Sequence, residues 1–251
     1  MINLAELVAY LDDLLEVDRF SDYCPNGIQV EGKPVVQRVV SGVTASQALL
    51  DAAAARQADV VLVHHGYFWR GEDARIVGMK RQRIQTLLQG GISLLAYHLP
   101  LDAHPVYGNN AQLGERLGFV TDGQFGQGVP AIGLYGHLPM AMSAEALSER
   151  IEQVLQRKPL HINGGTRAIN SIAWCSGAAQ GYIEQAVELG VDAYLSGEIS
   201  EQTVHIAREA GIHYFAAGHH ATERYGVQAL GAHLATQFVL EHDFIDIANP
   251  V

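Results

Sequence analysis

Residues 45–65 read ASQALLDAAAARQADVVLVHH, an alanine-rich helical pattern followed by a short apolar strand that ends on two histidines. Shifted forward by 133 positions, this segment meets residues 178–198, AAQGYIEQAVELGVDAYLSGE. Five aligned pairs are identical: Ala45 and Ala178, Gln47 and Gln180, Ala53 and Ala186, Asp59 and Asp192, and Leu62 and Leu195. The helix–strand order is the same in both segments, which predicts an internal repeat.

The repeat continues downstream at another offset. Residues 84–97 predict a further helix and strand, and at an offset of 120 Gly91, Ile92 and Ala96 meet Gly211, Ile212 and Ala216. Helices that alternate with short buried strands are typical of an α/β fold. We therefore predict two internally repeated α/β lobes with mixed sheets. We expect these lobes to be intertwined, because both halves of the chain contribute residues to one candidate metal site, described below.

The lobe boundaries are predicted from composition. The first lobe is expected to span residues 1–122 and the second residues 123–222, with the segment from about 223 to 251 packing back on the first lobe. Glycine and proline mark the stretch 121–139, which is the predicted junction between the lobes.

Bulk composition excludes several classes of protein. The 251 residues are 48% hydrophobic and 17% charged, as in an ordinary globular protein. The net charge of −11 argues against a general duplex-binding surface, which needs clustered cations. Two distant cysteines do not suggest a disulfide framework, and the N-terminus lacks the basic start of a signal peptide. We expect a cytoplasmic protein that does not span a membrane.

Polar residues that can bind metal follow several apolar runs. They are His64 and His65, then His98 and Asp102, and then His219, His220 and Glu223. In sheets whose strands alternate with helices, ligands bind at the carboxyl ends of the strands. A single histidine is most often a hydrogen-bonded or solvated imidazole, but this clustering predicts a dinuclear metal centre. Either Asp102 or Glu223 can bridge the ions.

Other histidines are assigned supporting roles. His98, His104 and His220 are interpreted as residues that orient the ligands or carry protons, and Glu198 as a further proton-transfer or orienting group. A set of imidazoles and carboxylates without thiolates suits two divalent ions of Zn, Fe, Mn, Co or Ni, and does not choose among them.

Several motifs together resemble a known family. They are YCPNGIQVEG (23–32), GVTAS (42–46), VHHGYFW (63–69), HLPLDAH (98–104), SGE (196–198) and AGHHATE (217–223). From about residue 20 to the C-terminus the chain resembles the GTP cyclohydrolase I type 2 family, especially its compact bacterial YbgI-type members. The resemblance implies two intertwined α/β lobes, a toroidal homohexamer and a dinuclear metal site facing its interior. The family's ligand positions match His64, His65, Asp102, His219 and Glu223, with Glu223 as the bridge.

The residues after the histidine pair suggest a substrate surface. Trp69 and Arg70 are candidate substrate-binding residues, because an aromatic ring can stack on a base and a cation can hold a phosphate. Further cations follow at Arg75, Lys80, Arg81 and Arg83. The alternative is a loop that packs its aromatics at a subunit contact, followed by a solvated helix face. Asn26 and Gln29 belong to a predicted turn from which either side chain could reach the site.

Three functions remain open on this basis. The first is a metal-dependent hydrolase of a nucleotide or related ring; in its GTP cyclohydrolase form, metal-bound hydroxide attacks C8 of the purine, the ring opens and formate leaves. The second is a hexameric scaffold or adaptor whose metals have no catalytic role. The third is capture of single-stranded or damaged nucleic acid in the ring interior. Five ligands shared by two ions leave open coordination positions, which favours the enzyme.

Overall fold

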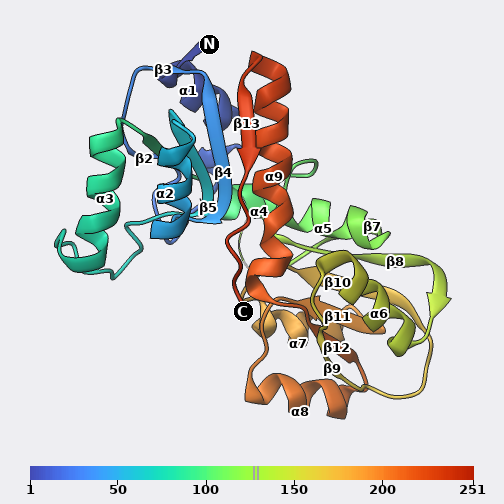
Figure 1. Cartoon of the computed structure of the whole chain (residues 1–251). Helices are drawn as coiled ribbons and strands as arrows, with labels where there is room; N and C mark the ends of the chain where they lie inside the picture. The colour runs from blue at the N-terminus through green and yellow to red at the C-terminus, as the bar shows by residue number, and fades with distance from the viewer. Residues whose placement is uncertain (127, 129) are drawn as a thin grey trace. The chain divides into compact units, whose positions relative to one another are not determined.

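The computed structural model describes residues 1–126, 128 and 130–251 (Figure 1). Contacts between Cα atoms divide the chain into two compact units, each made of separate stretches of sequence. Unit 1 comprises Met1–Gly108 and Gly226–Ala248, and unit 2 comprises Asn109–Tyr225 and Asn249–Val251. The two units are therefore interleaved along the chain, which confirms the prediction of intertwined α/β lobes.

Unit 1 contains a five-stranded sheet in the order β13-β4-β5-β6-β2. Its strands are β2 (Gly27–Val30), β4 (Arg38–Thr44), β5 (Val60–His65), β6 (Ser93–Ala96) and β13 (Glu241–Phe244). All neighbours are parallel except β2, which is antiparallel to β6. The remaining elements are β1 (Ile2–Asn3), β3 (Val35–Val36), α1 (Leu4–Leu14), the 3-10 helix η1 (Val17–Arg19), α2 (Gln47–Ala55), α3 (Gly78–Gly90) and α4 (Leu99–Ala103).

Strand β5 sends its side chains alternately into two apolar cores. Val60 and Leu62 pack in a cluster with residues of α1 and of α9 (His219–Phe238), whereas Val61 and Val63 pack in a cluster with residues of α2 and α3. Successive side chains of a strand point to opposite faces of the sheet. The two histidines that end β5 therefore leave the strand in different directions.

Unit 2 contains a six-stranded sheet in the order β7-β8-β10-β11-β12-β9. Its strands are β7 (Val120–Phe125), β8 (Gly133–Met142), β9 (Leu160–Ile162), β10 (Ile169–Cys175), β11 (Ala193–Ser196) and β12 (His213–Ala216). Strands β10, β11 and β12 are parallel, and the others pair antiparallel. The helices are α5 (Asn109–Leu117), α6 (Ala144–Leu155), the 3-10 helix η2 (Gln180–Tyr182), α7 (Ile183–Glu188) and α8 (Glu201–Ala210). Helix α9 (His219–Phe238) begins in unit 2, and its residues from Gly226 onward are grouped with unit 1.

The strand registers of the two sheets repeat at the offsets found in the sequence. Val39 pairs with Val60, and 133 residues later Ile172 pairs with Ala193. The β5–β6 and β11–β12 registers match in the same way. The β2–β6 and β9–β12 registers also match at two pairs, before a bulge in β2 shifts the third by one residue. Strands β6 and β12 lie at the offset of 120. These agreements confirm the internal repeat.

The stretch 121–139, predicted as the lobe junction, instead forms most of the β7–β8 hairpin inside unit 2, although residues 127 and 129 lie outside the described part. The chain first passes from unit 1 to unit 2 between Gly108 and Asn109. Glycines in this hairpin allow close strand contact: a Cβ on Gly136 would lie 1.8 Å from the Val120 carbonyl oxygen. Composition alone does not separate such packing glycines from linker glycines.

Candidate metal centre

The parallel strands of unit 1 bring the first candidate ligands to one sheet edge. Val63 of β5 pairs with Ala96 of β6, so His64 and Tyr97 are the next residues along neighbouring strands. Helix α4 begins two residues after Tyr97 and carries Asp102. The sequence prediction that these residues follow strand ends agrees with this arrangement, except that His64 and His65 are the last residues of β5 itself.

His64 is fully buried and its ring is fixed by the backbone. Its Nδ1 lies 2.9 Å from the Tyr97 carbonyl oxygen. Because a carbonyl only accepts hydrogen bonds, Nδ1 carries the hydrogen and Nε2 of the neutral ring presents a lone pair. That Nε2 lies 3.5 Å from Oδ1 of Asp102, whose side chain is 6% exposed. Two electron-pair donors at this distance suit a shared cation.

Three imidazoles gather at this edge of the sheet. The ring centroid of His64 lies 4.6 Å from that of His65 and 5.0 Å from that of His98, and one ring nitrogen of each histidine lies within 4.8 Å of the others. His65 Nδ1 lies 3.2 Å from Oγ1 of Thr44 on the neighbouring strand. The structure therefore adds His98 to the predicted pair.

A carboxylate that sequence reasoning missed holds His98. Oδ1 of Asp22 lies 2.7 Å from His98 Nδ1, and Oδ2 accepts the Leu99 amide at 2.9 Å. Burial raises the pKa of Asp22, but the hydrogen bond and charge of His98, with the bonds from Asn26 and Leu99, outweigh it and lower the pKa to about 2. Asn26, predicted as a turn residue, also reaches the site and accepts the His98 amide at 2.7 Å.

Cys24 lies near this pair, since one atom each of Asp22, Cys24 and His98 fall within 4.8 Å of one another. Burial, together with the charge of Asp22, raises the pKa of the Cys24 thiol to about 12. A thiolate is the form that binds metal. The group is therefore a poorer donor set than the three histidines.

Of the two predicted substrate residues, Trp69 lies beside the histidines. Its ring centroid is 5.0 Å from that of His98 in an edge-on arrangement, and its Nε1 donates to the Gly66 carbonyl at 3.2 Å. Arg70 donates instead to the Asp22 carbonyl at 2.9 Å. Gln29, the other predicted turn residue, bonds to both backbone groups of Tyr67 and so fixes the start of this loop.

The basic run after Arg70 is partly neutralised by nearby acids. Arg75 pairs with Asp73 at 2.7 Å, and Lys80 pairs with Glu72 at 2.9 Å. The Arg75 side chain is 78% exposed, which favours the interpretation of a solvated surface segment there, whereas the Lys80 side chain is 13% exposed. The guanidinium of Arg83 lies 6.0 Å from the centre of the Tyr67 ring, and Arg81 is exposed.

Unit 2 places a second donor pair at the start of α9. His219 Nε2 lies 3.2 Å from Oε2 of Glu223, one helical turn later, and Nδ1 lies 2.7 Å from Oε1 of Glu198. Burial lowers the pKa of His219, but hydrogen bonds and charges of Glu223 and Glu198 outweigh it and raise the pKa to about 9. A carboxylate on Nδ1 is the usual way in which a metal-binding histidine is oriented.

Gly177 leaves room for this pair. It has φ +67°, and a Cβ built on it would lie 2.2 Å from Glu223 Oε1 and 3.2 Å from His219 Nε2. Glu223 itself is buried, with 3% of its surface exposed. A buried carboxylate beside an imidazole, next to a glycine whose Cβ would crowd both side chains, fits a metal ligand pair.

The other predicted histidines occupy different surroundings. His220 is buried, and its backbone amide donates to the Val251 carbonyl oxygen at 3.0 Å. In unit 1, His104 uses Nδ1 to accept the amides of Val106 and Tyr107, at 3.2 and 2.9 Å, and stacks on the Tyr107 ring. These contacts indicate that His104 fixes the loop after α4.

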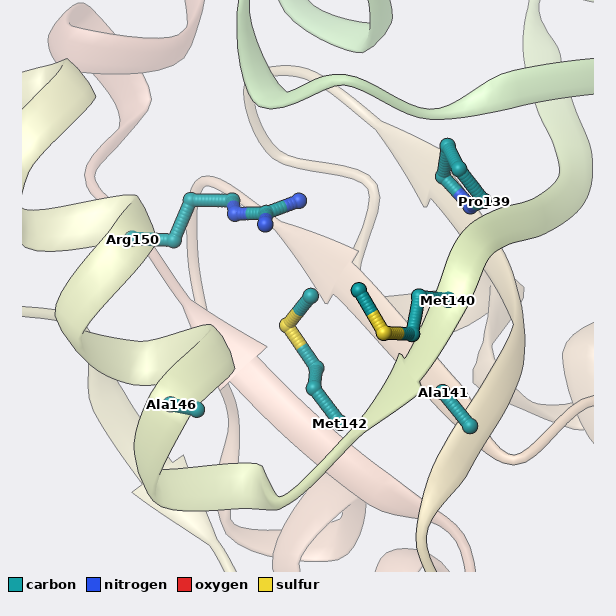
Figure 2. Close-up of a pocket in the computed structure, with 6 residues that line it drawn as sticks. All are labelled: Pro139, Met140, Ala141, Met142, Ala146 and Arg150. Atoms are coloured by element: carbon teal, nitrogen blue, oxygen red, sulfur yellow. The ribbon is translucent and has the colours of Figure 1, made fainter.

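Figure 2 shows a separate pocket of unit 2, between α6 and the end of β8. It is lined by Pro139, Met140, Ala141, Met142, Ala146 and Arg150. The side chains of Met140, Met142 and Arg150 extend into it (Figure 2). Arg150 is the one ionisable residue of this lining, so the pocket offers no metal ligands of the kind found at the strand ends.

Comparisons with known proteins agree with the motifs. The model of the Duf34/NIF3 (NGG1p interacting factor 3) family matches residues 2–250. The GTP cyclohydrolase 1 type 2 homolog of Pseudomonas aeruginosa is 59% identical over 250 residues, covering 99% of each chain. That of Allochromatium vinosum is 55% identical, covering 100% of this chain and 98% of the relative. The solved structure of protein ybgI, described as of unknown function, has a TM-score of 0.96, 49% identity and full coverage of both chains.

None of the helices in the described part of the chain has the length and apolar character needed to span a membrane.

Proposed function

Since this chain belongs to the Duf34/NIF3 family, we propose that it is a dinuclear metal-dependent hydrolase acting on a nucleotide or a related ring. The observation that carries the proposal is the pairing of imidazole with buried carboxylate at strand ends in both units: His64 with Asp102, and His219 with Glu223. In the proposal, two divalent ions would be held by His64, His65, Asp102, His219 and Glu223, with Glu223 available to both.

The donor chemistry fits divalent transition ions. Imidazoles and carboxylates suit Zn, Fe, Mn, Co or Ni, and the buried position of His64, Asp102 and Glu223 limits competition from water. Ions of this kind act as Lewis acids that polarise a substrate oxygen and make a water molecule acidic near neutral pH.

Protein groups set the orientation of the donors. The Tyr97 carbonyl keeps the hydrogen of His64 on Nδ1, and Glu198 accepts the Nδ1 hydrogen of His219. Each ring then directs Nε2 toward a carboxylate of the proposed ligand set. His98, His220 and Glu198 are the residues that we propose for proton transfer or ligand orientation.

Trp69 and Arg70 are proposed to bind the substrate. The Trp69 ring beside His98 offers an aromatic surface to a heterocyclic base, and Arg70 offers a cation next to it. Several relatives carry the name GTP cyclohydrolase 1 type 2 homolog, so GTP is the first substrate to test. That reaction requires two water molecules: the first adds at C8 of the purine and opens the ring to a formamide, and the second hydrolyses the formamide to release formate.

The proposed working form is a ring-shaped homohexamer in the cytoplasm, as the family resemblance implies. Light scattering coupled to size-exclusion chromatography gives the mass of the particle directly. A monomeric or dimeric particle at micromolar concentration would remove the ring from the proposal.

The decisive experiment combines metal analysis with a nucleotide screen. Purified wild type should contain about two divalent ions per chain and hydrolyse at least one nucleotide, whereas Glu223→Ala should lose metal and turnover together. Glu209→Ala, an exposed carboxylate on α8, is the control and should behave as wild type. Metal-replete protein that hydrolyses nothing but binds a partner protein would favour the scaffold, and salt-dependent retention of single-stranded DNA would favour nucleic-acid capture.

A further inference from the structure

The carboxylate of Asp22, near the proposed centre, is 3% exposed and accepts hydrogen bonds on both of its oxygens. Oδ1 accepts the Tyr23 amide at 2.6 Å and lies 2.7 Å from His98 Nδ1. Oδ2 accepts the side-chain amide of Asn26 and the Leu99 amide, both at 2.9 Å. Four hydrogen bonds on two oxygens leave this carboxylate little capacity to bind a cation. Its role is therefore to hold the groups that donate to it.

Several of these hydrogen bonds fix the position of His98. Asp22 accepts from the ring of His98 and from the amide of the next residue, while Asn26 Oδ1 accepts the amide of His98 itself. The Trp69 ring lies on another side of the imidazole, at an interplanar angle of 86°. Backbone and ring of His98 are thus both fixed, although 15% of the side chain remains exposed.

We propose that Asp22 is a positioning residue that, with Asn26, holds His98 with its hydrogen on Nδ1 and so turns Nε2 toward His64 and His65. A carboxylate has no hydrogen to donate, so the 2.7 Å contact places the hydrogen on the imidazole Nδ1. With Nδ1 engaged, Nε2 is the nitrogen that His98 offers to the histidine cluster. There it accepts a hydrogen bond from water or substrate.

This inference rests on the proposed function for its purpose, but the orientation of His98 is independent of any turnover. A pair of this kind resembles the carboxylate–imidazole pairs that fix the tautomer of a histidine in many active sites. The same arrangement occurs in unit 2, where Glu198 lies 2.7 Å from His219 Nδ1. Asp22 and Glu198 therefore perform matching tasks on histidines of the two units.

Nuclear magnetic resonance of zinc-loaded, ¹⁵N-histidine-labelled protein tests the assignment. His98→Gln identifies the His98 signals by difference. Wild type should show His98 with hydrogen on Nδ1, and Asp22→Ala should shift it toward the Nε2–H form that free histidine prefers. Asp51→Asn, an exposed carboxylate on α2, should leave the His98 signals unchanged.

Two further readouts separate positioning from support of the fold. In Asp22→Ala the metal content should stay at the wild-type level, and where a substrate has been found kcat should fall about 100-fold with little change in KM. If Asp22→Ala does not fold, Asp22→Leu serves instead, because it has a similar branched shape and no acceptor for the Nδ1 hydrogen. His98 that keeps its Nδ1 hydrogen in a folded Asp22 variant overturns the proposal, as does loss of metal in parallel with activity. Absence of metal and turnover in wild type refutes the proposed function, while the tautomer still decides the role of Asp22.

Discussion

Asp59 and Asp192, at equivalent positions of the two repeats, each accept two backbone amides from the neighbouring strand segment. Oδ2 of Asp59 accepts the amides of Gln37 and Arg38, at 2.9 and 3.1 Å. Oδ2 of Asp192 accepts the amides of Asn170 and Ser171, at 3.0 and 2.9 Å, and these donors are again 133 residues further along. In both units an aspartate just before the second parallel strand fixes the start of the first.

This relationship predicts how acid affects unit 2. Burial raises the pKa of Asp192, but the bonds from Ser171 and Asn170 outweigh it and lower the pKa below its ordinary 3.8. A group with a depressed folded pKa stabilises the fold above its unfolded pKa, and that stability is lost as the pH falls through the folded pKa. Asp192→Ala should lower the free energy of unfolding by about 1 kcal/mol near neutral pH, after allowance for solvent screening. The deficit should shrink below about pH 4, as measured by thermal unfolding across pH. A deficit that does not change with pH would contradict the assignment.

Substitution of Gly177 should have effects beyond the strain of its backbone conformation. Gly177→Ala brings a methyl group to 2.2 Å from Glu223 Oε1. Gly190 is the matched control, since it has a similar φ of +70° and a Cβ there would meet nothing within 4 Å. Both variants should lose about 1 kcal/mol from backbone strain, but only Gly177→Ala should also lose bound metal by mass spectrometry of the metal content. Equal metal content in the two variants would show that Gly177 is not part of the ligand cradle.

Glu198 should tune metal affinity without supplying a ligand. Glu198→Gln keeps an oxygen for the His219 Nδ1 hydrogen but removes the charge, so we expect metal affinity to fall about 10–100-fold. Competition with a chromophoric chelator measures this change. The exposed Glu201→Gln on α8 is the control and should match wild type. An unchanged affinity in Glu198→Gln would leave Glu198 no role in orienting His219.

Trp69 should affect substrate binding more than metal binding. Its ring lies beside His98 and outside the proposed ligand set. Trp69→Ala should raise KM about 10-fold for a heterocyclic substrate, whereas Trp69→Phe should retain most of the stacking. Phe68→Ala in the same loop, 36% exposed, is the control. Should Phe68→Ala and Trp69→Ala raise KM equally, the aromatic run acts as packing and not as a substrate surface.

The sequence predicted the repeated α/β plan because helix periodicity and strand ends are local signals. The candidate ligands were found for the same reason, since each follows an apolar run. Asp22 was missed because its hydrogen-bond partner, His98, is 76 positions away in the chain. The junction was misplaced because packing glycines such as Gly136 look like linker glycines. The acidic ion-pair partners of the basic run could have been predicted from the sequence, since Glu72 and Asp73 lie within that run.

The matching registers show where the two copies have diverged. The offset between them falls from 133 at β5 to 120 at β6, so the first copy carries 13 extra residues between these strands. That surplus lies in the segment that follows His65 and includes Trp69 and Arg70. The two copies thus keep equal sheet frameworks, while the connection beside the histidines is longer in the first copy than in the second. Chemical diversity among descendants of this duplication should accordingly be sought in the length and composition of that single connection.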